Sequence, residues 1–143
     1  MIDPRPIYAA FLAVLGERPL ADFPDVLLVP ATETADLPGA YVVLSVSLKS
    51  VPGLRGNATA DFSAEFSLCL PPEGRAREEV ESAFSALIES VAARASAAAL
   101  SAAAREISAP VFFYSAALAR IDAPSYARDR LVQSLAIEGQ AQF

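Results

Sequence analysis

Apolar and polar residues alternate through Thr59-Ala-Asp-Phe-Ser-Ala-Glu-Phe-Ser-Leu-Cys-Leu70 almost without a break. One side of an extended chain would carry the apolar side chains Ala60, Phe62, Ala64, Phe66, Leu68 and Leu70. The other side would carry Thr59, Asp61, Ser63, Glu65, Ser67 and Cys69. This period of two predicts a strand with one buried face and one face in water.

A helix is predicted directly after this strand, because the apolar period then changes from two to 3.6. Beyond Pro71-Pro72-Glu73-Gly74, the larger apolar residues fall at Val80, Phe84, Leu87, Ile88 and Val91. Residues 75–104 contain no Gly or Pro, yet one straight helix of that length would reach roughly 45 Å, too long for so small a core. We therefore expect a break near Arg94 to Ser96 and a short second helix in the Ala-rich segment 95–104.

The remaining elements follow from the same two periods. A helix is expected over Ile7 to Leu15, ended by Gly16, and a brief extended segment over Val26 to Val29, ended by Pro30. Further strands are expected over Tyr41 to Lys49, Val111 to Ala119 and Leu131 to Phe143. Residues 1–143 are thus predicted to form a single α+β domain, with a mainly antiparallel sheet of four to five strands packed against two or three helices.

Two polar segments are candidate contact loops. The connection Ser50 to Asn57 is longer than a tight hairpin needs and places Leu54, Arg55 and Asn57 near its tip, where a purely solvated loop has little use for leucine. An ordinary mobile hairpin tip is the alternative. The segment from Asp122 to Arg130 is the second candidate, and its proposed contact residues are Asp122, Tyr126, Arg128 and Arg130.

Most catalytic, cofactor and metal chemistry is excluded by composition. The chain has no His and a single cysteine, Cys69, so Ser-His-Asp and Cys-His catalysis and cysteine-built metal sites are ruled out. Neither a dinucleotide-binding nor a P-loop glycine motif is present. Asp61 and Glu65 would lie about 13 Å apart on a solvated or interface-forming face. We therefore predict no catalytic residue, cofactor or metal, and a protein that is not an enzyme.

The charge and hydropathy of the chain indicate which partners it can bind and which cell compartment it suits. Eleven Lys and Arg residues against 17 Asp and Glu give a formal net charge of −6, which argues against general binding to nucleic acid. No run of 18 apolar residues occurs, and the first six residues lack the pattern of a signal peptide. With one cysteine no intramolecular disulfide can form, so we expect a soluble protein of a reducing compartment, without membrane contact.

The order of these elements resembles the tail terminator (tail completion) family of long-tailed bacteriophages, siphophages among them, and of phage-like particles such as gene transfer agents. The resemblance rests on the helix containing Ile7-Tyr-Ala-Ala-Phe-Leu with Pro24-Asp25 after it, and on the hairpin formed by Tyr41 to Lys49 and Ala58 to Leu70. It also rests on the helix from Glu78 to Ala92 and on Asp129-Arg130-Leu131, which leads into a strand ending Leu135-Ala136-Ile137-Glu138. The Ala-rich segment 95–104 departs from the family's pattern.

The resemblance implies a structural virion protein that is assembled in the host cytoplasm and resides in the tail or neck. Such a protein forms a homo-oligomeric ring, commonly a hexamer, on the head-proximal end of the tail tube, where it ends tube growth and joins the tail to the head connector or stopper protein. DNA passes through the ring without specific binding. Two alternatives stay open, namely another neck component, such as a head completion or head-tail joining protein, and a small ligand-binding or regulatory domain.

Overall fold

The computed structural model describes residues 3–23, 25–30, 40–51, 59–70, 77–127 and 130–143. Its helices are α1 (Arg5–Leu15), α2 (Arg77–Arg94) and α3 (Ala97–Glu106). Its strands are β1 (Leu27–Pro30), β2 (Tyr41–Val51), β3 (Thr59–Leu70), β4 (Phe112–Ile121), β5 (Ser125–Ala127) and β6 (Arg130–Gln142). Each helix and strand expected from the sequence is therefore present, and β5 is added to them.

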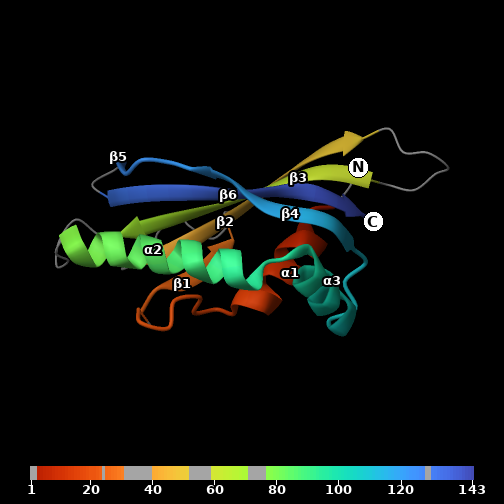
Figure 1. Ribbon diagram of the computed structural model, residues 1–143, viewed down its shortest axis with the longest axis horizontal. Coiled ribbons are helices and arrows are strands. Elements are labelled where there is room, and N and C mark those ends of the chain that lie inside the picture. Colours follow the sequence, from red (N-terminus) through yellow and green to blue (C-terminus); the bar gives the residue numbers. More distant parts are fainter. Residues whose placement is uncertain (1–2, 24, 31–39, 52–58, 71–76, 128–129) are drawn as a thin grey trace.

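The strands form one sheet in the order β1-β2-β3-β6-β4, and the short β5 also pairs with β6. β1 runs parallel to β2, whereas all other pairs are antiparallel. Figure 1 shows the three helices together on one side of this sheet. The predicted α+β class with a mainly antiparallel sheet is confirmed. The strand order leaves β1 and β4 at the two edges of the sheet.

The core lies between the sheet and the helices, and the alternation of β3 decides which side chains enter it. All the apolar residues predicted to face inward on β3, from Ala60 to Leu70, are at most 2% exposed. Phe11 of α1 packs edge-to-face on Phe62, Phe66 and Phe113, with ring centroids 6.2, 5.5 and 6.3 Å away. Edge-to-face packing of this kind stabilises a core beyond the area that it buries.

The predicted break in the long helical segment is confirmed between Arg94 and Ala97. α2 carries Glu78 and Glu79 in its first turn and Arg94 in its last turn, in the order that the helix dipole favours. Ser96 then caps α3, because its side-chain oxygen accepts a 3.1 Å hydrogen bond from the Ala99 amide. The two helices are bent by 74° relative to each other at the break, so the segment is not one straight helix.

The segment between β4 and β6 differs from the expected loop. Ser125 to Ala127 form β5, which pairs with Val132, Leu131 and Arg130 at the start of β6. Tyr126 and Arg130 are therefore strand residues of one hairpin and do not lie in an open loop. No strand was predicted here, because the three residues of β5 are too few to show a period of two. The other candidate loop, with Leu54, Arg55 and Asn57, lies outside the described residues, as does Arg128.

Gly139 is the position where β4 and β6 approach too closely for a side chain. A Cβ atom there would lie 1.9 Å from the carbonyl oxygen of Ser115, beside the register shift between Phe113 and Ser115. We predict that Gly139→Ala lowers the free energy of unfolding by about 1 to 3 kcal/mol, because the backbone of β4 must move. Denaturant unfolding compared with Glu138→Ala, an exposed neighbour, measures this cost. Equal stabilities of the two variants would contradict it.

Candidate assembly surface

The face of the sheet that turns away from the helices is polar, and we call it the polar sheet face. The register of the strands places successive polar side chains of β3 beside those of β2 and β6 on this face. Its described polar members include Ser45, Ser47, Lys49, Thr59, Asp61, Ser63, Glu65, Ser67, Arg120, Ser134, Glu138, Gln140 and Gln142, and the register also places the apolar Val43 and Ala136 on it. The sheet therefore keeps one face for the core and presents the other to solvent or to a partner.

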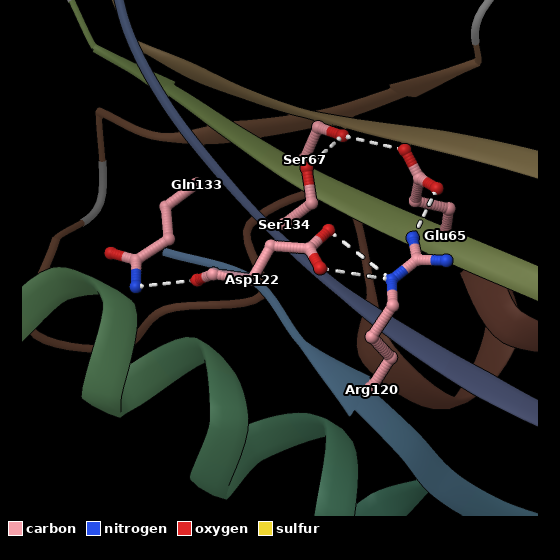
Figure 2. A network of polar contacts seen from close by, with 6 residues as sticks. All are labelled: Glu65, Ser67, Arg120, Asp122, Gln133 and Ser134. Atoms are coloured by element: carbon pink, nitrogen blue, oxygen red, sulfur yellow. Dashed lines mark hydrogen bonds and ion pairs between the residues drawn. The ribbon is translucent and has the colours of Figure 1, made fainter. Parts of the chain in front are cut away.

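One end of the polar sheet face is crossed by a network of polar contacts centred on Arg120 (Figure 2). A guanidinium nitrogen of Arg120 in β4 lies 2.6 Å from a carboxylate oxygen of Glu65 in β3. Its Nε lies 3.0 Å from the Asp122 carboxylate. Arg120 thus connects an edge strand to the middle of the sheet, across β6.

The network continues through neutral groups. The hydroxyls of Ser67 and Ser134 lie 2.8 Å apart on β3 and β6, where they are direct cross-strand partners. The side-chain amide of Gln133 donates a 3.0 Å hydrogen bond to the carbonyl oxygen of Asp122 (Figure 2). The first contact joins β3 to β6, and the second holds Asp122, which directly follows β4, against β6.

The electrostatic effect of this network is local. The hydrogen bond to Glu65, followed by the charge of Asp122, raises the pKa of Arg120 above its ordinary value. The side chain of Arg120 is 46% exposed and that of Glu65 is 43% exposed, so water and salt screen the pair. We therefore infer that the network fixes the positions of these surface side chains and contributes little to the free energy of unfolding.

Carboxylates outnumber cations on this side of the sheet. At the other end of the face, the Gln140 amide donates a 3.0 Å hydrogen bond to Asp61, which pairs in register with Lys49. The described charged side chains of the face and its rim are the cations Lys49 and Arg120 and the carboxylates Asp61, Glu65, Asp122 and Glu138. Such a surface lacks the clustered cations that phosphate binding requires.

Neither a metal-binding cluster nor an unpartnered buried polar side chain occurs among the described residues. They contain no group of three or more His, Cys, Asp or Glu side chains placed to hold a metal ion. Every buried side-chain nitrogen or oxygen among them has a hydrogen-bond partner. The thiol of Cys69 is buried and lies 3.7 Å from the Ser67 carbonyl oxygen. These features are typical of structural side chains.

No single described helix is long and apolar enough to cross a membrane, and α2 and α3 meet the criteria of length and composition only as a pair, bent by 74°.

The candidate contact residues divide into two groups. Asp122 lies in the polar network, and the backbones of Tyr126 and Arg130 lie in the adjacent β5–β6 hairpin, so the structure brings these three to one end of the sheet. Leu54, Arg55, Asn57 and Arg128 lie outside the described residues. Sequence analysis missed Arg120 and its bond to Glu65, because the two residues are brought together only by the strand order. The nearest local signal is Asp122, two residues after Arg120.

Comparison with known proteins gives a match in structure only. No protein-family model matches the chain, and no curated protein matches it. Among solved structures, a chain from the virion of a native gene transfer agent (GTA) particle matches with a TM-score of 0.54 at 15% sequence identity. The match covers 95% of this chain and 93% of that chain. At this identity the comparison shows a shared fold, which extends over nearly the whole of both chains.

Proposed function

We infer that the protein is a structural, non-enzymatic component of a phage-like virion and that it acts there as the tail terminator. The observation that carries this proposal is the fold shared with a chain of a gene transfer agent virion over 95% of this chain. Because the match spans both chains, it concerns the arrangement of the whole domain and not one common motif. The resemblance in element order to the tail terminator family supports the finer assignment.

The surface chemistry is consistent with this role. The described charged side chains of the polar sheet face and its rim are two cations, Lys49 and Arg120, and four carboxylates, Asp61, Glu65, Asp122 and Glu138. A net charge of −6 and a polar sheet face richer in carboxylates than in cations suit a ring through which DNA passes without being held.

We propose that the subunits assemble in the host cytoplasm into a hexameric ring. One side of the ring would cover the last ring of tail tube protein and the other would receive the head connector or stopper protein. Head-to-tail contacts between identical subunits close into rings when the rotation between neighbours allows it. The proposed contact residues at these surfaces are Leu54, Arg55, Asn57, Asp122, Tyr126, Arg128 and Arg130.

Another neck component, such as a head completion or head-tail joining protein, is supported by the same shared fold. The two roles differ in the partner that is bound first, because a terminator acts on a finished tube before heads are joined. A small ligand-binding domain has less support, because such a pocket needs a few convergent polar groups in an enclosed site. The hollow on the polar sheet face, lined by Lys49, Asp61 and Gln140, is open to solvent.

The test is a binding experiment with purified tail tubes. We predict that the protein forms rings, alone or on tube ends, visible by negative-stain electron microscopy and light scattering, and that capped tubes no longer grow when tube protein is added. Leu54→Ser combined with Arg55→Glu should weaken capping while the thermal unfolding midpoint stays unchanged. A protein that stays monomeric and ignores tubes would contradict the terminator role, and binding to heads alone would favour another neck component.

A further inference from the structure

β4 is an edge strand, so alternate residues direct their backbone N–H and C=O groups away from the sheet. The Asp122 amide donates a 2.9 Å hydrogen bond to the Ser134 carbonyl oxygen. The Gln140 amide donates a 3.1 Å hydrogen bond to the Ser115 hydroxyl. The even-numbered residues of β6 therefore bond toward β4, and the β4 residues opposite its odd-numbered residues point outward. These outward residues are Phe113, Ala116, Leu118 and Ile121.

At Phe113 the outward groups are bonded by a helix. The Phe113 amide donates a 2.9 Å hydrogen bond to the hydroxyl oxygen of Ser101 in α3. The same hydroxyl donates a 3.3 Å hydrogen bond to the Phe113 carbonyl oxygen. A serine hydroxyl can accept and donate at once, so one side chain satisfies both groups that a neighbouring strand would otherwise satisfy. We call this pair of bonds the edge contact.

The small side chains of α3 make the edge contact possible. Ser101 is 7% exposed and is the only buried polar residue in the described part of the chain. Ala97, Ser101 and Ala104 are spaced i, i+4 and i+7, so they share one face of α3. The distance at which a helix packs depends on the side chains at the contact, and a short hydroxyl reaches a strand backbone only from a helix that lies close. The Ala-rich segment 95–104 thus has a structural reason.

The turn between α3 and β4 places the helix beside the start of the strand (Figure 1). Ser108 has a φ of 57°, in the left-handed region where many helices end. The Ala109 amide then donates a 2.8 Å hydrogen bond back to the Ala104 carbonyl oxygen. β4 begins at Phe112, three residues further on. The edge contact is therefore made by the element that directly precedes the strand.

The rest of the β4 edge differs from its start. Within the part of the chain that the structure describes, the outward backbone groups of Ala116, Leu118 and Ile121 have no hydrogen-bond partner. A row of open groups is a template for pairing with another chain, and natural proteins block such rows. We propose that α3 is an edge-blocking helix, in which Ser101 takes the place of a neighbouring strand and closes the start of β4 to strand addition. This role does not depend on the proposed tail terminator function.

Amide hydrogen exchange of the natural chain, followed residue by residue by NMR, tests the edge contact without any substitution. The amides of Phe113, Leu118 and Ile121 all point outward from the same edge strand. We expect the Phe113 amide to exchange about 100-fold more slowly than the other two, because only this amide must break a hydrogen bond before it exchanges. Equal protection of the three amides would overturn the proposal.

Ser101→Ala removes the edge contact, and Ser115→Ala is its matched control. Ser115 also bonds a backbone amide through its hydroxyl, but that amide belongs to Gln140 of β6 and faces the inside of the sheet. Ser101→Ala should raise the exchange rate of the Phe113 amide about tenfold or more relative to that of Phe66 in the central strand. The ratio removes any general loss of stability, because global unfolding accelerates both amides equally. An unchanged ratio would contradict the proposal.

Thioflavin T fluorescence gives a second readout, which a purely packing role of Ser101 would not change. An unblocked edge should add strands of other copies, so the fluorescence of Ser101→Ala should rise with concentration above that of Ser115→Ala and of the natural chain. Open-ended aggregates in negative stain distinguish this growth from closed rings. If the Phe113 amide exchanges faster in Ser101→Ala while the fluorescence of the two variants stays equal, Ser101 only holds the strand, and the edge-blocking role is wrong.

Discussion

Replacement of Phe66 by alanine should lower the free energy of unfolding by about 3 to 5 kcal/mol. Phe66 is fully buried in the central strand β3, between Leu44 of β2 and Leu135 of β6. Its ring packs edge-to-face on Phe11, with centroids 5.5 Å apart. Truncation leaves a cavity that the strands on both sides are too constrained to fill. A loss of this size is a large share of the roughly 5 to 15 kcal/mol that stabilises a small domain.

The matched control for this substitution lies three residues away on the same strand. Ser63 faces the polar sheet face, so Ser63→Ala should change stability by less than about 0.5 kcal/mol. Urea unfolding followed by circular dichroism measures both variants, and an unchanged slope shows that the same surface is exposed. A double-mutant cycle with Phe11→Ala should add a coupling of about 0.5 to 1.5 kcal/mol. Similar stabilities of Phe66→Ala and Ser63→Ala would contradict the assignment of Phe66 to the buried face of β3 and of Ser63 to its polar face.

The sequence contained enough information for the elements whose signal is local. The alternation from Thr59 to Leu70 predicts the inward face of β3 residue by residue, because burial on one face imposes the period. The break between α2 and α3 was predictable from the change to Ala and Ser after Val91. Ser96, the cap of α3, lies within the predicted break.

The arrangement of the strands is information that local patterns do not carry. β6 lies between β3 and β4, although β4 and the two helices precede it in the chain, and nothing in the composition of β4 indicates an edge. Phe112 and Tyr114 have the residue types of a buried strand, yet they are exposed because no element follows β4 in the sheet. The Arg120–Glu65 pair joins residues 55 positions apart and likewise depends on this order. The apolar composition of β4 therefore predicted a strand, but it did not predict that this strand lies at an edge of the sheet with its side chains exposed.

Deletion of residues 139–143 should abolish cooperative unfolding, because the end of β6 completes the sheet of its own subunit. This segment pairs on one side with Thr59 to Phe62 of β3 and on the other with Phe112 to Ala116 of β4. Its Ala141 is fully buried and pairs with Phe113, whose ring lies 5.4 Å from that of Phe62. The deletion removes backbone hydrogen bonds worth about 0.5 to 1.5 kcal/mol each and leaves half of β4 without a partner.

The measurement separates a role in folding from a role in assembly. Urea unfolding of the truncated protein should show a broad transition with a reduced slope, whereas Glu138→Ala, next to the cut and exposed, should unfold like the natural chain. A truncated protein that unfolds cooperatively but no longer forms rings would instead assign the segment to a neighbouring subunit. One that both folds and assembles normally would contradict the pairing of this segment in the sheet. Because Phe113 anchors β4 to the core, we expect the truncated protein to show the broad transition with the reduced slope.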